Sequence, residues 1–236
     1  MSTALLIAAI APAIFLIVKV YRADRLEKEP IGLLVLLVVL GIVSTFGAIV
    51  LEMVGEWLLD GFLYYNSLLY KLIYYFVVIA GSEELVKFVM LKLGSYKKQA
   101  FNCMFDGIVY AVSVSLGFAL FENILYVMES GWSVALLRAV TAIPGHACFG
   151  VFMGVWYGCA KYMQVKVNKP MEKVYLWLSV LLPMVIHGLY DFVLSMNSSL
   201  VILVFVVFVS VLFLVTVSVV KNFALEDFYL EDSGEV

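Results

Sequence analysis

The sequence predicts an all-α fold, a polytopic membrane bundle of about seven transmembrane helices. Of the 236 residues, 64% are hydrophobic and only 14% are charged, whereas a soluble domain typically has about 45–50% apolar and about 25% charged residues. The mean hydropathy of +1.06 agrees with this. No stretch is long and polar enough for a separate soluble domain, so we expect one integral-membrane domain over residues 1–222 and a short acidic cytoplasmic tail over 223–236.

Seven apolar segments define the expected helices, at residues 3–20, 31–54, 68–91, 107–128, 134–160, 174–195 and 199–220. Each is close to the roughly 20 residues that a helix needs to cross the hydrocarbon core. Basic residues follow the first segment instead of preceding it, so we expect a retained span and not a secretion signal. Pro144-Gly145 and Pro183 are expected to interrupt the fifth and sixth helices. The aromatic-rich segment 55–67 is expected to be a loop at the membrane surface, with a short helix on that surface as an alternative.

Lys and Arg side chains occur in alternate loops. They follow the first, third, fifth and seventh segments, at Lys19, Arg22, Arg25 and Lys28, at Lys92, Lys97 and Lys98, at Lys161, Lys166, Lys169 and Lys173, and at Lys221. The segments 55–67, 129–133 and 196–198 contain neither residue type. Because cytoplasmic loops carry the excess of Lys and Arg, we predict an N-terminus outside and a C-terminus in the cytoplasm.

Six ionisable side chains within the apolar segments stand out, and His146 is a seventh candidate. The six are Glu83, Glu84, Lys87, Glu122, His187 and Asp191. A charge at the centre of a membrane costs about 2.5–3.5 kcal/mol. Such groups are therefore retained where they face one another or a water-filled cavity. Together they predict a polar functional site inside the bundle.

The third segment contains Glu83, Glu84 and Lys87 in an EExxK pattern. Lys87 is four residues after Glu83 and three after Glu84, so one helical face can pair a carboxylate with the ammonium group. The other carboxylate can then face a cavity, and a desolvated carboxylate has the raised pKa that a general base needs. The alternative is an ion pair that only ties helices together.

The fourth, fifth and sixth segments supply the remaining candidates. Phe118 and Glu122 share a helical face, with Asn123 beside them. His187 and Asp191 are one turn apart, so the carboxylate can fix the tautomer of the imidazole. His146 and His187 are the two histidines of the chain, and both fall in apolar segments. A zinc site built from the same cluster and the proton relay of a transporter are alternatives to a metal-free catalytic site.

Four motifs together resemble the PrsW family of bacterial intramembrane proteases: EELVK at 83–87, FDGIVYAVSVSLGFALFENILY at 105–126, GHACFG at 145–150 and HGLYD at 187–191. That family is related to the CAAX prenyl endopeptidases and the bacteriocin-immunity membrane proteases, whose pattern is EExxxR, FxxxH and HxxxN/D. The chain departs from this wider pattern twice. Lys87 comes one position before the expected basic residue, and Glu122 replaces the histidine of FxxxH.

The resemblance implies a multi-pass protease of the bacterial cell membrane. It would make the site-1 cleavage of a single-pass membrane anti-sigma factor on the extracytoplasmic side, and so start sigma-factor release under envelope stress. We expect glutamic-type hydrolysis without a cofactor, and no nucleic-acid partner. Glu83 is the preferred base, with Glu84 held by Lys87. The other expected catalytic groups are His146 beside the attacking water, His187 with Asp191 at the oxyanion or the leaving amine, and Glu122 as a proton carrier or an anchor for an imidazole.

Overall fold

The computed structural model describes residues 3–65, 67–196 and 198–231, and within them the chain is almost entirely helical. In chain order the helices are α1 (Thr3–Ala23), α2 (Ile31–Phe62), α3 (Leu68–Ile73), the π-helix η1 (Tyr74–Ile79), α4 (Ala80–Ser95), α5 (Asp106–Ser130), α6 (Trp132–Val140), α7 (Ala142–Val165), α8 (Lys169–Leu194) and α9 (Ser199–Leu225). Six stretches of the described chain are long and apolar enough to cross a membrane. The predicted all-α membrane bundle is confirmed.

The helices differ from the expected ones in four respects. Helix α2 continues to Phe62, so most of the loop expected at 55–67 is helical. The fifth segment breaks at Thr141, between α6 and α7, and Pro144 lies in the first turn of α7, where no intrahelical N–H bond is lost. Pro183 lies inside an uninterrupted α8. The third segment divides into α3, η1 and α4, each too short to count alone as a span.

Helix α5 is the core of the bundle, and every residue from 106 to 119 is buried. It packs between α2 and α7 through pairs of glycines. A Cβ on Gly117 would lie 2.2 Å from the carbonyl oxygen of Val38 in α2, and one on Gly107 would lie 2.6 Å from that of Gly154 in α7. Small residues of this kind let membrane helices approach closely. This close packing places α4, α5, α7 and α8 around one polar cluster.

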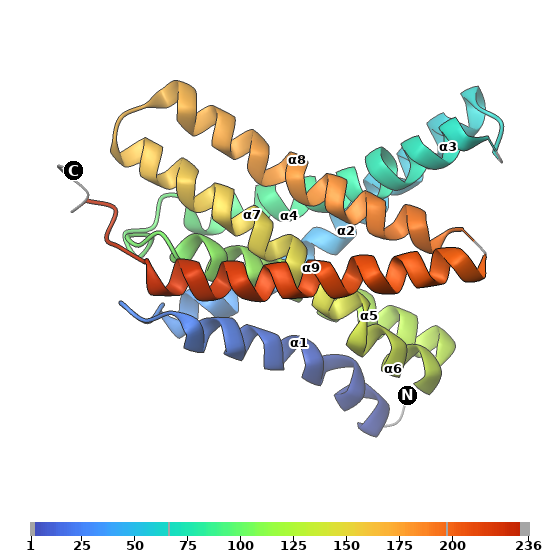
Figure 1. The fold of residues 1–236 in the computed structure, drawn as a ribbon, viewed down its shortest axis with the longest axis horizontal. Coiled ribbons are helices and arrows are strands. Elements are labelled where there is room, and N and C mark those ends of the chain that lie inside the picture. The colour runs from blue at the N-terminus through green and yellow to red at the C-terminus, as the bar shows by residue number, and fades with distance from the viewer. Residues whose placement is uncertain (1–2, 66, 197, 232–236) are drawn as a thin grey trace.

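The basic loops meet at one end of the bundle, where α1, α4, α7 and α9 all end (Figure 1). The chain after α9 returns to the segment before α5 at this end. The amide of Met104 donates to the carbonyl of Phe228 at 3.2 Å, and that of Phe105 donates to the carboxylate of Asp227 at 2.8 Å. The loops that the charge pattern assigns to the cytoplasm are therefore together in space.

Candidate functional site

Four helices bring the candidate residues together. Glu83, Glu84 and Lys87 lie on α4, Phe118, Glu122 and Asn123 on α5, His146 on α7, and His187 and Asp191 on α8. The π-helix η1 leads directly into α4, and π turns are frequent at functional sites. A Cβ on Gly188 would lie 2.6 Å from the ring of Phe76 in η1. This close contact holds α8 against the start of α4, next to His187.

Lys87 is fully buried and is the centre of the cluster. Its Nζ lies 2.9 Å from Glu83 Oε2 and 2.8 Å from Glu84 Oε1. The ring of Phe118 lies beneath the ammonium group, with its centroid 4.0 Å from Nζ. Two carboxylates and an aromatic face thus compensate a charge that would otherwise be very costly in the membrane. The spacing predicted one ion pair, and Lys87 makes one with each carboxylate.

The two carboxylates of α4 differ in what they reach. Glu83 lines the cavity described below, and its side chain keeps 8% of its exposure. Glu84 is fully buried, and its Oε1 also lies 2.9 Å from His187 Nδ1. Its other oxygen, Oε2, is buried without a hydrogen-bond partner among the described residues. Glu83 is therefore the carboxylate that meets the cavity, and Glu84 lies behind it.

His146 bridges α4 and α5. Its Nδ1 lies 3.2 Å from Lys87 Nζ, and its Nε2 lies 3.0 Å from Glu122 Oε2. An ammonium group can only donate, so we assign Nδ1 as the acceptor and place the proton on Nε2, which donates to Glu122. Glu122 thus fixes the tautomer of His146, which is one of the two roles that the sequence left open for it.

His187 lies between two carboxylates on its own helix and on α4. Its Nδ1 faces Glu84, and its Nε2 lies 3.3 Å from Asp191 Oδ2. The predicted one-turn pair of His187 and Asp191 is present in the structure. The ring of Phe149 stacks on the imidazole with centroids 4.5 Å apart and an interplanar angle of 20°. The ring is therefore held by Phe149 on one face and by carboxylates at both nitrogens.

Arg138 on α6 is a site residue that the sequence analysis missed. Its Nη2 lies 2.8 Å from Glu122 Oε2, and its Nε donates to Asn123 Oδ1 at 2.9 Å. Asn123 in turn donates to the carbonyl of Ala9 at 2.8 Å, so it positions Arg138 and does not line the cavity. Glu52 on α2 was also missed, although it lines the cavity. Both were ionisable groups in apolar segments, the signal that identified the others.

These groups surround a cavity of about 540 Å³. Its polar lining consists of Glu52, Glu83, Glu122, Arg138, His146, His187 and Asp191, together with Tyr74, Tyr75, Tyr126, Tyr190, Thr141 and Ser195. Its volume is within the range of roughly 300–1,000 Å³ that is typical of ligand sites. Seven acidic, basic and imidazole side chains that are spread over more than 100 residues of sequence thus line one cavity.

Comparison with known proteins gives matches to one family over most of the chain. The family described as "PrsW family intramembrane metalloprotease" matches residues 29–218. Protease PrsW of Halalkalibacterium halodurans is 37% identical over 217 residues, which cover 92% of this chain and 95% of that protein. Protease PrsW of Bacillus subtilis is 34% identical over 197 residues, covering 83% and 85% respectively. Protease PrsW of Clostridioides difficile is 30% identical over 225 residues, covering 93% and 91%. No solved structure matches the chain.

The family description corrects one expectation. We expected no cofactor, and this is wrong, because the matching family is one of metalloproteases. The residues present fit a metal ion: Glu83, Glu84 and His146 each offer a ligand atom, and these atoms lie within 4.8 Å of one another. Carboxylates and imidazoles are ligands that zinc accepts. The unpaired Glu84 Oε2 offers a further donor atom.

Charge also favours a cation at this site. Among the described residues, the carboxylates at or behind the cavity are those of Glu52, Glu83, Glu84, Glu122 and Asp191. Only Lys87 and Arg138 oppose them with permanent positive charge. A buried excess of negative charge is unfavourable in a membrane unless protons or a cation offset it. The spacing of the motifs did not reveal this balance, because Glu52 and Arg138 lie outside the motifs.

Proposed function

This chain belongs to the PrsW family of intramembrane metalloproteases, and from that membership we propose that it cleaves a single-pass membrane anti-sigma factor at the cavity between α4, α5, α7 and α8. The cut would be the first, extracytoplasmic step that leads to sigma-factor release under envelope stress. The observation that carries the catalytic part of this proposal is the convergence of two histidines and four carboxylates on one cavity inside the bundle, with a fifth carboxylate, Glu84, directly behind it. The family resemblance supports the choice of substrate.

In this proposal Glu83, Glu84 and His146 hold the metal. A metal ion held there would supply Lewis-acid chemistry for the hydrolysis of a peptide bond. Lys87 holds the two carboxylates in place from beneath. Glu122, bonded to His146 Nε2, keeps the imidazole oriented with Nδ1 toward α4. That nitrogen accepts from Lys87 in the structure and would exchange this contact for the metal. Partners of this kind fix the direction of ligands in metal sites.

His187 and Asp191 provide the proton for the leaving amine. The side chain of Asp191 is the most exposed of the ion-paired groups at the site, at 23%, and it lies 3.3 Å from His187 Nε2. A proton shared between these two atoms is within reach of the cavity and can pass to the amine. Stacking on Phe149 keeps the ring in the orientation that this transfer needs.

Co-expression with a tagged candidate anti-sigma factor tests the proposal. The wild-type chain is expected to produce a membrane-bound fragment, and Glu84→Gln and His187→Gln to lower the rate by about 100-fold or more. Glu129→Gln is the matched control, because Glu129 is exposed and lies outside the cavity. A chelator should abolish cleavage by the purified wild type, and zinc should restore it.

Two results would contradict different parts of the proposal. Cleavage of an unrelated single-span protein without cleavage of any anti-sigma factor would refute the substrate. Full cleavage by both cluster variants, or full activity after chelation with no metal left by elemental analysis, would refute the assignment of the site.

A further inference from the structure

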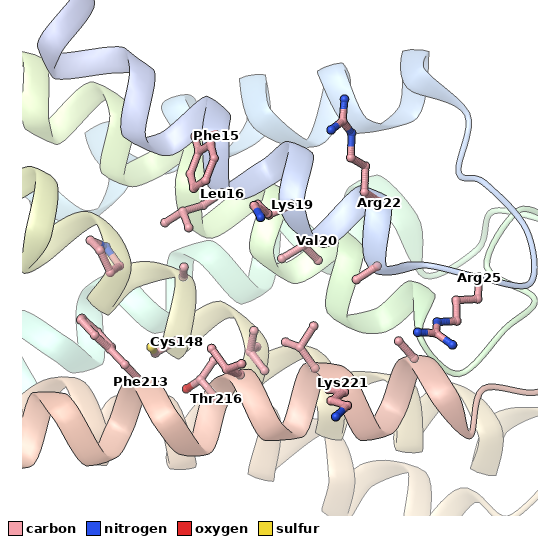
Figure 2. A pocket seen from close by; sticks show the side chains of 17 residues that line it. Phe15, Leu16, Lys19, Val20, Arg22, Arg25, Cys148, Phe213, Thr216 and Lys221 are labelled. Atoms are coloured by element: carbon pink, nitrogen blue, oxygen red, sulfur yellow. The ribbon is translucent and has the colours of Figure 1, made fainter.

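A second cavity lies on the other side of α7, between α1 and α9 (Figure 2). Its volume is about 680 Å³. Apolar side chains form its walls, among them Leu16 and Val20 of α1, Ala147 and Val151 of α7, and Phe213 and Val220 of α9. None of the ionisable residues of the polar cavity lines this groove. The groove is therefore separate from the polar cavity, and none of its residues has a role in the proposed catalysis.

One end of this groove is strongly basic. Lys19 and Arg22 of α1, Arg25 in the following loop and Lys221 of α9 line it, and all four are exposed. Within the described residues, no carboxylate oxygen lies within 4.0 Å of any of these four side chains. The neighbouring Asp24 does not offset them at the surface, because it is 98% buried, with 2% of its surface exposed. In Figure 2 Arg25 and Lys221 lie at the same end of the groove, while Arg22 turns away from α9.

We propose that the groove binds one anionic phospholipid from the leaflet at the basic end of the bundle. The acyl chain would lie along the apolar walls between α1 and α9, and the phosphate would bind Lys19, Arg25 and Lys221. Phosphate oxygens form strong charge-assisted bonds with such side chains. A zwitterionic headgroup would bring its own positive charge against them, so the site selects for net negative charge.

The shape and charge of the groove favour a lipid over a protein helix. Its apolar walls lead to exposed basic side chains at one end, which matches an acyl chain joined to a phosphate. The basic residues are also placed where a headgroup would be, at the end of the bundle where α1 and α9 reach the loops.

Helix α7 connects the groove with the polar cavity. Ala147, Cys148 and Val151 face the groove, whereas His146 and Phe149 line the polar cavity. A lipid in the groove therefore packs against the helix that carries His146. We expect the bound lipid to stabilise this helix and the whole fold, which can be measured without any substrate.

The test compares two lipids that differ in headgroup alone, phosphatidylglycerol and phosphatidylcholine with identical acyl chains. With wild-type protein in detergent, native mass spectrometry should show one tightly bound phosphatidylglycerol, and added phosphatidylglycerol should raise the unfolding temperature more than phosphatidylcholine does. Each neutralised basic residue should weaken binding roughly fivefold. The triple variant Lys19→Gln, Arg25→Gln, Lys221→Gln should therefore lose about 100-fold in affinity.

Two further variants separate groove binding from general charge attraction. Lys97→Gln, Lys98→Gln, Lys169→Gln removes the same charge from exposed positions outside the groove and should bind like the wild type. Val217→Trp adds bulk to an exposed position that lines the groove and should abolish tight binding without a change in charge. Equal losses in the two triple variants, equal binding of both lipids, or an equal shift with inorganic phosphate alone would overturn the proposal.

Discussion

Lys87 shows how single residues make a charged site tolerable inside a membrane. Its ammonium group contacts Glu83, Glu84 and His146 and rests on the ring of Phe118. Removing one partner from such a cluster leaves the others unpaired in a medium without water, which is more costly than losing the contact itself. The same logic explains Arg138, which neutralises Glu122 and is held in turn by Asn123.

Arg138→Gln is predicted to lower kcat by roughly 10–100-fold, the usual effect of losing a residue that orients a ligand. Without Arg138, Glu122 loses its ion pair and no longer fixes His146 firmly. Arg138→Lys keeps the charge and should recover part of the activity. Cleavage of a reconstituted substrate, with kcat and KM measured separately, checks this. Wild-type kcat in both variants would show that Arg138 has no positioning role.

At the scale of the helices, glycines decide how closely α5 approaches its neighbours. A Cβ on Gly41 of α2 would lie 2.1 Å from the carbonyl oxygen of Val114 in α5. The same contact from the other side involves Gly117 and Val38. No side chain fits at these positions unless the helices separate. The close approach of the two helices sets the distance between α2 and the part of α5 that contains Glu122.

Gly41→Ala is predicted to destabilise the fold by about 1–3 kcal/mol, because the added methyl group overpacks the contact between α2 and α5. Gly61→Ala on the same helix is the matched control. No atom lies within 4 Å of a Cβ at Gly61, so that change should be neutral or slightly stabilising, as alanine is the better helix former. Thermal unfolding in detergent measures both, and equal stability of the two variants would contradict the prediction.

At the scale of the whole molecule, the bundle has one basic end. The loops after α1, α4 and α7 and the end of α9 meet there, together with the described part of the C-terminal segment. Helices α4, α5, α7 and α8 supply the polar cavity together with residues of α2, η1 and α6, and α1, α7 and α9 with the loop after α1 form the apolar groove. The fold therefore separates a polar cavity from an apolar groove by the width of α7.

The charge distribution predicts that this basic end is cytoplasmic. A fluorescent protein fused to the C-terminus should fluoresce, and alkaline phosphatase at the same position should be inactive. The reason is that an excess of Lys and Arg keeps a membrane-protein loop in the cytoplasm. Fusions truncated after residue 131, between α5 and α6, should give the opposite result. The reverse pattern at both positions would show that the orientation is inverted.

The sequence by itself determined the class of the molecule and most of the ionisable residues of its site, although Glu52 and Arg138 were missed. Apolar segments of bilayer length require helices, since only helices and closed barrels satisfy the backbone in lipid. Ionisable groups inside them marked Glu83, Glu84, Lys87, Glu122, His187 and Asp191, because such groups are too costly to keep without partners. The pairs Glu83–Lys87 and His187–Asp191 followed from helical spacing and are present.

Only the tertiary structure decided which helices meet and which partners each group has. The contact of His187 with Glu84 joins residues 103 apart in sequence, and that of His146 with Lys87 joins residues 59 apart. Helical periodicity places a side chain on a face but does not say which helix packs against that face. That choice follows from the glycine contacts and the local break at Thr141. With this packing, Arg138 forms an ion pair with Glu122, and Glu83 lines the cavity whereas Glu84 does not.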